Sequence, residues 1–98
     1  MEFDWTSGFQ PTDISRKEIE ESFEDPFSIR LLPDLEDLGE REARYMILGR
    51  AISGRSLFTV FWTDGKRYRV IFSRLMTSEE QTFYERKNSQ FKIGRAHV

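Results

Sequence analysis

The stretch SLFTVFWTDGKRYRVIFSR, residues 56–74, constrains the fold of this chain more than any other feature. Two runs rich in β-branched and aromatic residues flank the adjacent pair Asp64 and Gly65, which is a strong signal for a β-hairpin. A two-residue loop at this pair would place Trp62 opposite Arg67 and Phe61 opposite Tyr68. The sequence therefore predicts a β-sheet that contains this hairpin.

The predicted hairpin has two unlike faces, because successive strand residues point to opposite sides. The face that combines cations with flat apolar side chains has two interpretations. Arginine stems there cover apolar area and keep the sheet soluble, or the surface meets a polyanion by stacking on it and pairing with its phosphates. This basic face carries Phe58, Val60, Trp62, Arg67, Arg69 and Ile71, and the core face carries Leu57, Thr59, Phe61, Tyr68, Val70 and Phe72.

The remaining sequence predicts a small α+β domain with the element order β-α-β-β-β-β-α. Ser15 and Glu18 have the spacing of a capping box, and the helix that they begin ends at Asp25, before a proline. Thr77 and Glu80 repeat this spacing before a last helix of about ten residues. Short connections favour an antiparallel meander with the two helices packed on one face. The other predicted strands are residues 3–5, 27–31 and 43–50.

Composition excludes several classes of site. The chain of 98 residues has no cysteine, which rules out disulfides and thiolate zinc sites. No apolar run approaches the roughly 20 residues that span a bilayer, and the N-terminus is acidic, so we expect a cytoplasmic protein without membrane contact. Residues 1–40 hold 12 acidic and 3 basic side chains, whereas residues 41–98 hold 5 and 12. This asymmetry indicates an electrostatic footprint on the second half.

The last residues of the chain are interpreted separately. Residues 92–98, KIGRAHV, resemble the translation of a sequencing-library adapter, so we expect one domain over residues 1–91 followed by a non-native tail. His97, the only histidine, falls in that tail. We therefore expect no metal site and no cofactor.

The residue types that remain for chemistry are arginine, lysine, tyrosine and glutamate, which can cleave RNA without a metal. The 2′-hydroxyl attacks the adjacent phosphate, guanidinium groups stabilise the developing charge, and a carboxylate or a phenol moves a proton. The candidate phosphate clamps are Arg69 and Arg74, which face opposite sides of a regular strand and the same side only if a bulge intervenes. Glu79 is the candidate proton carrier, although a glutamate there also favours the helix dipole. The candidate RNA contacts are Lys66, Arg67, Trp62, Arg50 and Arg55.

Several short motifs together resemble the BrnT family, the ribonuclease toxins of type II toxin–antitoxin pairs, which have a RelE-like fold. They are FDW at residues 3–5, FEDP at 23–26, GER at 39–41, LGR at 48–50, RVIFSR at 69–74 and TSEE at 77–80, with Tyr84 after them. The resemblance implies a metal-independent endoribonuclease that is neutralised by a ribbon-helix-helix antitoxin. It also implies contact with promoter DNA only through the toxin–antitoxin complex.

One departure from this family leaves a second hypothesis open. Family members place a Lys-His-Gly stretch before the first helix, and this chain has Pro11, Thr12 and Asp13 there instead. The alternative is a degenerate, non-catalytic member that binds an antitoxin or a nucleic acid. A structural domain whose charges only keep it soluble is the third hypothesis.

Overall fold

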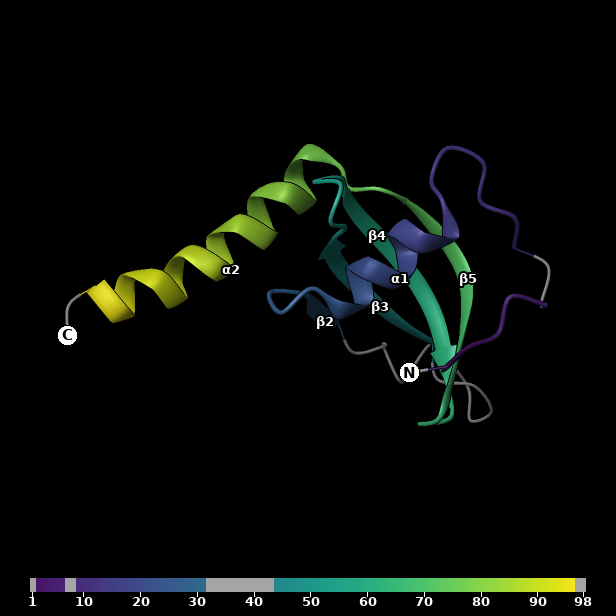
Figure 1. Cartoon of the computed structure of the whole chain (residues 1–98). Coiled ribbons are helices and arrows are strands. Elements are labelled where there is room, and N and C mark those ends of the chain that lie inside the picture. The colour runs from purple at the N-terminus through teal and green to yellow at the C-terminus, as the bar shows by residue number, and fades with distance from the viewer. Residues whose placement is uncertain (1, 7–8, 32–43, 97–98) are drawn as a thin grey trace.

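The computed structural model describes residues 2–6, 9–31 and 44–96, with side chains through residue 89 (Figure 1). It confirms the α+β class and the predicted order of elements. The GER motif at residues 39–41 lies outside the described residues. The elements are β1 (Glu2–Phe3), α1 (Arg16–Glu24), β2 (Ile29–Leu31), β3 (Arg44–Arg50), β4 (Ser56–Thr63), β5 (Arg67–Leu75) and α2 (Ser78–Ala96).

The strands form one mixed sheet in the order β1-β5-β4-β3-β2. The last four strands are antiparallel neighbours, which confirms the predicted meander. β1 joins the sheet at its edge and runs parallel to β5, with Glu2 beside Arg67 and Phe3 beside Tyr68. The N-terminal strand therefore lies next to the basic strand, although the two are far apart in sequence.

The predicted two-residue loop at the hairpin is wrong. Thr63 pairs with Tyr68 rather than with Lys66, so four residues separate the paired positions, and the turn covers residues 64–66 before β5 begins at Arg67. The reason is that the Asp64 carboxylate accepts hydrogen bonds from the backbone N–H groups of Lys66 and Arg67, both at 2.9 Å. Gly65 has a φ of +98°, a conformation that only glycine adopts readily.

A bulge in β5 corrects the predicted faces of the hairpin. Val60 pairs with Phe72 and Phe61 with Val70, so Ile71 is the extra residue on β5. Beyond the bulge the alternation is reversed. Phe72, predicted in the core, is 44% exposed, and Ser73 takes the buried place.

Helix α1 packs across one face of the sheet and supplies much of the core (Figure 1). The predicted capping box is present, because the Ser15 hydroxyl accepts a 3.0 Å hydrogen bond from the Glu18 N–H and the Glu18 carboxylate accepts one from the Ser15 N–H. Gly49 lets the helix approach, since a Cβ there would lie 2.2 Å from the carbonyl oxygen of Ser22. The buried core comprises Ile14, Ile19, Phe23, Ile47, Leu57, Phe61 and Val70.

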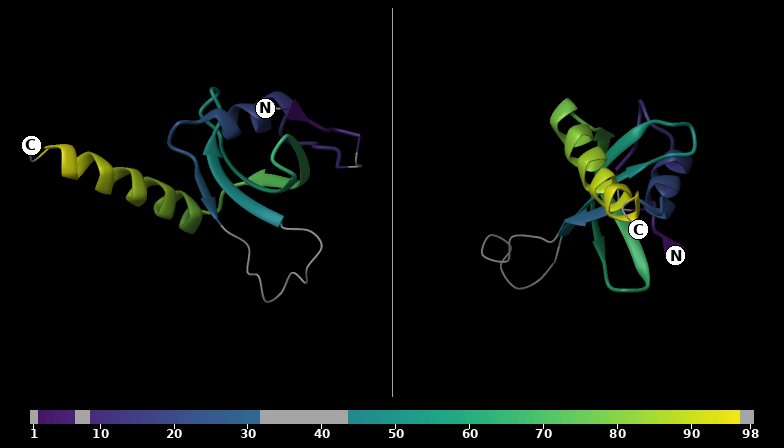
Figure 2. Two further views of the ribbon diagram at one scale, coloured as in Figure 1. Left: turned by 90° about the horizontal axis from the view of Figure 1, so that it is seen from below. Right: turned by 90° about the vertical axis from the view of Figure 1, so that its left-hand side faces the viewer.

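Helix α2 is longer than the predicted helix of about ten residues, since it covers 19 residues. No proline occurs after Pro33 to force an earlier end. Its first turns pack at the end of the sheet, where buried Tyr84 contacts Leu48 and Met76, and the rest extends away from the body (Figure 2). The non-native origin of residues 92–98 stays a prediction. Within the described residues, no helix is long and apolar enough to cross a membrane.

Candidate nucleic-acid interface

The first part of the site is a row of side chains across the sheet near the hairpin loop. Arg69 pairs with Trp62 across the strands, and its guanidinium carbon lies 5.1 Å from the centre of the Trp62 ring. Arg44 occupies the register position on the other side of Trp62. A cation stacked on a flat ring, with a second cation beside that ring, suits a nucleotide, since a base can stack there and a phosphate can pair with the guanidinium groups.

The Arg69 guanidinium makes no hydrogen bond to Asp4. Its Nη2 atom lies 3.9 Å from the Asp4 carboxylate, beyond hydrogen-bond distance, and the side chain is 40% exposed. Its Nε atom is sealed from solvent and has no hydrogen-bond partner among the described residues. Arg69 therefore still presents donors to a ligand.

Asp4 itself is fixed by its own neighbours. One carboxylate oxygen accepts hydrogen bonds from the backbone N–H and the hydroxyl of Thr6. These bonds are the main reason that the pKa of Asp4 is below its ordinary value, and the charge of Arg69 adds to the effect. Asp4 therefore stays ionised beside Arg69 at neutral pH.

The second part of the site is a row near the start of α2. Arg74 pairs with Phe58, and its guanidinium carbon lies 4.3 Å from the ring centre. Both terminal nitrogens donate to the Glu80 carboxylate, at 2.8 and 3.0 Å. These hydrogen bonds lower the pKa of Glu80 and raise that of Arg74. Arg74 is therefore already occupied by a bidentate partner.

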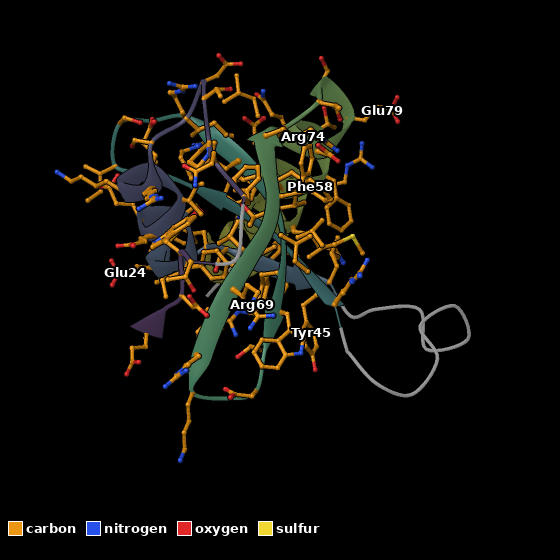
Figure 3. All side chains as sticks on the ribbon, turned by 90° about the vertical axis from the view of Figure 1, so that its right-hand side faces the viewer. Glu24, Tyr45, Phe58, Arg69, Arg74 and Glu79 are labelled. Carbon is orange, nitrogen blue, oxygen red and sulfur yellow. The ribbon has the colours of Figure 1, made fainter. Side chains whose placement is uncertain are left out.

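The bulge at Ile71 brings the two rows to the same side of the sheet, with Trp62 and Phe58 both on one face of β4. Figure 3 shows Arg69 and Arg74 spaced along β5, with Glu79 pointing outward at the start of α2. No hydrogen bond or ion pair joins Glu79 to either arginine within the described part of the chain. Glu80, the neighbouring residue, makes that contact instead.

The predicted RNA contacts divide into two groups. Lys66 and Arg67 lie in and beside the hairpin loop, near Trp62, and Arg67 is 66% exposed with its Nε 3.9 Å from Glu2. Arg50 and Arg55 lie at the opposite end of β4. The Arg50 guanidinium stacks on Tyr84 at 5.2 Å and lies 3.7 Å from Glu85.

Arg55 is engaged in a separate contact. It donates a 2.7 Å hydrogen bond to the backbone oxygen of Asp13 and lies 3.6 Å from the Glu18 carboxylate. Lys66 and Arg67 thus lie at the same end of the hairpin as the Arg69 row, and Arg50 and Arg55 lie at the other end.

Sequence reasoning missed two members of the Arg69 row. Arg44 is the first residue of β3, and only the β3–β4 register places it beside Trp62. Asp4 reaches Arg69 only because β1 runs parallel to β5. The FDW motif includes Asp4, but the motif alone does not predict the contact of Asp4 with Arg69.

Tyr84 is not available as a base. Burial raises the pKa of its phenol well above the ordinary value, and its hydroxyl donates a hydrogen bond to the Asp25 carboxylate, which raises it further. The phenol therefore keeps its proton and ties α2 to the end of α1. Within the described residues no three acidic, histidine or cysteine side chains are grouped as metal ligands.

No protein-family model matches this chain, and no match was found among curated proteins or solved structures.

Proposed function

We propose that this protein binds single-stranded RNA at the Arg69–Trp62 row and acts as a ribonuclease toxin of the BrnT type. The observation that carries the proposal is the exposed guanidinium of Arg69 stacked on Trp62 at 5.1 Å. One base stacked on an aromatic side chain contributes about 1–3 kcal/mol, and the requirement for an exposed base face favours single strands over duplexes.

The cleavage proposed here needs no metal. The 2′-oxygen of the bound nucleotide forms a bond to the adjacent phosphorus while the bond to the 5′-oxygen breaks, which leaves a 2′,3′-cyclic phosphate and a 5′-hydroxyl. The proton of the 2′-hydroxyl is lost and the leaving 5′-oxygen gains one. Arg69 stabilises the charge on the phosphate oxygens in the transition state. Glu79, the proposed proton carrier, belongs to the start of α2 beside the Arg74 row (Figure 3), so its participation requires an RNA strand that spans both rows with the scissile phosphate between Arg69 and Glu79.

A second candidate function is favoured by a specific observation. Arg74 is neutralised by Glu80, and Tyr84 is bonded to Asp25, so two of the groups that could assist the chemistry are occupied. A non-catalytic module that binds RNA or an antitoxin would need only the Arg69 row. The resemblance to BrnT supports a ribbon-helix-helix antitoxin as partner in both cases, with promoter DNA bound only through the complex.

The test compares the purified full chain with its Arg69→Ala variant on single-stranded RNA in excess EDTA. A toxin cleaves the RNA to cyclic-phosphate ends, and Arg69→Ala abolishes cleavage while remaining folded. Arg86→Ala is the matched control, because it removes the same charge from an exposed position on α2. Binding without cleavage supports the non-catalytic module, and no binding to RNA overturns both the toxin and a module that binds RNA. Induction of this chain alone, and together with any ribbon-helix-helix protein encoded next to it, then tests for an antitoxin.

A further inference from the structure

The N-terminal strand places two carboxylates against the basic strand. Phe3 anchors β1, since its ring packs against Phe23 and Tyr68 with centroid distances of 5.0 and 5.9 Å. Its neighbours Glu2 and Asp4 each approach an arginine of β5, in both cases at 3.9 Å. Negative charge beside a phosphate-binding arginine has two opposite consequences, because it repels the ligand and it also orients the arginine.

The geometry around Asp4 indicates that this carboxylate orients the Arg69 guanidinium rather than neutralising it. Two hydrogen bonds from Thr6 to one oxygen orient its carboxylate. The Asp4 carboxylate lies too far from Nη2 of Arg69 to accept a hydrogen bond, so this N–H donor stays available. On the other side the guanidinium lies on the Trp62 ring.

The sealed Nε of Arg69 is the second observation. A buried donor without a partner is uncommon and costs free energy, so the side chain is held in this position by its surroundings. The fixed carboxylate on one side and the indole ring on the other account for this position. The side chain as a whole is 40% exposed, so part of the guanidinium stays accessible to a ligand.

We propose that Asp4 is a positioning residue, which holds Arg69 over the Trp62 ring so that one nucleotide can stack and pair there. This inference rests on the proposed RNA binding, but its first consequence can be measured without RNA. Glu2 does not share the role, because it is 80% exposed and its partner Arg67 is itself 66% exposed.

The test uses Asp4→Asn, which keeps an oxygen for the Thr6 hydrogen bonds and removes the charge. Loss of a nearby negative charge should by itself strengthen phosphate binding, because the carboxylate and the phosphate are both anions and repel each other. Loss of positioning should weaken it. We expect RNA binding to weaken by about threefold, the scale of an exposed charge pair. Tighter or unchanged binding overturns the proposal.

The readout without RNA is hydrogen exchange at the Arg69 Nε–H, followed by nitrogen NMR. The sealed group should exchange slowly in the unmodified protein and faster in Asp4→Asn, with no change in the unfolding midpoint. Glu2→Gln is the matched control and should leave this exchange unchanged. Equal exchange in Asp4→Asn and the unmodified protein overturns the positioning role.

A failure of the proposed RNA binding and a failure of the positioning role of Asp4 give different results. If the unmodified protein binds no RNA, the proposed function fails, and the exchange experiment alone then decides whether Asp4 positions Arg69. If the unmodified protein binds RNA but exchange does not respond to Asp4→Asn, the proposed function stands and the positioning role is overturned.

Discussion

Arg69 and Arg74 belong to the same strand, stack on rings of the same neighbouring strand, and still have different surroundings. Arg74 makes two hydrogen bonds to Glu80 and a third to the backbone oxygen of Leu75. Arg69 has a carboxylate at 3.9 Å and no hydrogen bond to it. The same residue type with the same stacking contact is therefore structural in one place and available to a ligand in the other.

The difference arises from the two carboxylates. Glu80 is held at the first turn of α2 by its capping box with Thr77, close in sequence to Arg74, and one of its oxygens serves both contacts. Asp4 is held by Thr6 on a short edge strand. Bidentate pairing depends on a carboxylate that faces the guanidinium edge, and only Glu80 does.

Inserting one alanine between Val60 and Phe61, opposite Ile71, should disrupt the two rows most strongly. The added residue pairs with Ile71 and cancels the bulge, so both strands alternate regularly, either Val70 or Ser73 leaves its buried place, and the two arginines no longer share a side. We expect the free energy of unfolding to fall by at least about 3 kcal/mol, measured by urea denaturation. Ile71→Val keeps the residue count and should cost less than about 1.5 kcal/mol. An insertion variant as stable as the unmodified protein would contradict the role of the bulge.

Arg69→Ala should affect RNA binding far more than stability. The variant loses a phosphate-pairing guanidinium and exposes the Trp62 ring, so we expect RNA affinity to fall about tenfold, or about 1.4 kcal/mol. The free energy of unfolding should change by less than about 1 kcal/mol, since the pair with Asp4 is exposed. Anisotropy titration and urea denaturation measure the two quantities. A large stability loss with unchanged affinity would make Arg69 another structural arginine.

Arg74→Ala should show the opposite pattern. The variant loses the bidentate pair with Glu80 and the stack on Phe58, so we expect the free energy of unfolding to fall by about 1 kcal/mol. RNA affinity should fall less than in Arg69→Ala, because the guanidinium is already occupied. The same two measurements apply. An affinity loss as large as that of Arg69→Ala would show that RNA displaces Glu80.

The sequence predicted the order of the elements and the Arg69 row correctly in large part, but it did not predict the pairing register of the hairpin strands. The capping-box spacings of both helices and the alternation in β4 are local signals, and the structure confirms them at Ser15, Thr77, Leu57, Thr59 and Phe61. The longer loop kept the same parity as the predicted one, so Arg69 still shares a face with Trp62. The Asp64 carboxylate accepts two backbone hydrogen bonds inside the turn, and these bonds favour the longer turn. The preference of an Asp-Gly pair for a two-residue turn does not include these bonds.

The rest of the site depends on contacts between distant residues. The capping pattern identified Glu80 as a cap, but its bond to Arg74 also requires the chain to turn sharply after β5. The Asp4–Arg69 approach requires β1 to pair in parallel with β5. The extra residue at Ile71 follows from seating both Val70 and Ser73 in the core. Local periodicity contains none of this information.

The smallest expected effect is in the titration of the two carboxylates. The pKa of Glu80 is lowered mainly by Arg74, whereas that of Asp4 is lowered mainly by Thr6. Arg74→Ala should therefore raise the pKa of Glu80 toward its ordinary value of 4.5. Arg69→Ala should leave the pKa of Asp4 below its ordinary 3.8. Carboxyl carbon NMR in both variants measures the two shifts.

The sign of the stability effect follows from the lowered pKa of Glu80. The ionised carboxylate stabilises the fold fully above its ordinary pKa of 4.5, and this contribution is lost as the pH falls through the lower value of the folded state. Arg74→Ala should flatten the decrease in unfolding free energy over that acidic range, and Arg69→Ala should not. Equal flattening in both variants would mean that Asp4 depends on its arginine as strongly as Glu80 does, and the difference between the two rows would disappear.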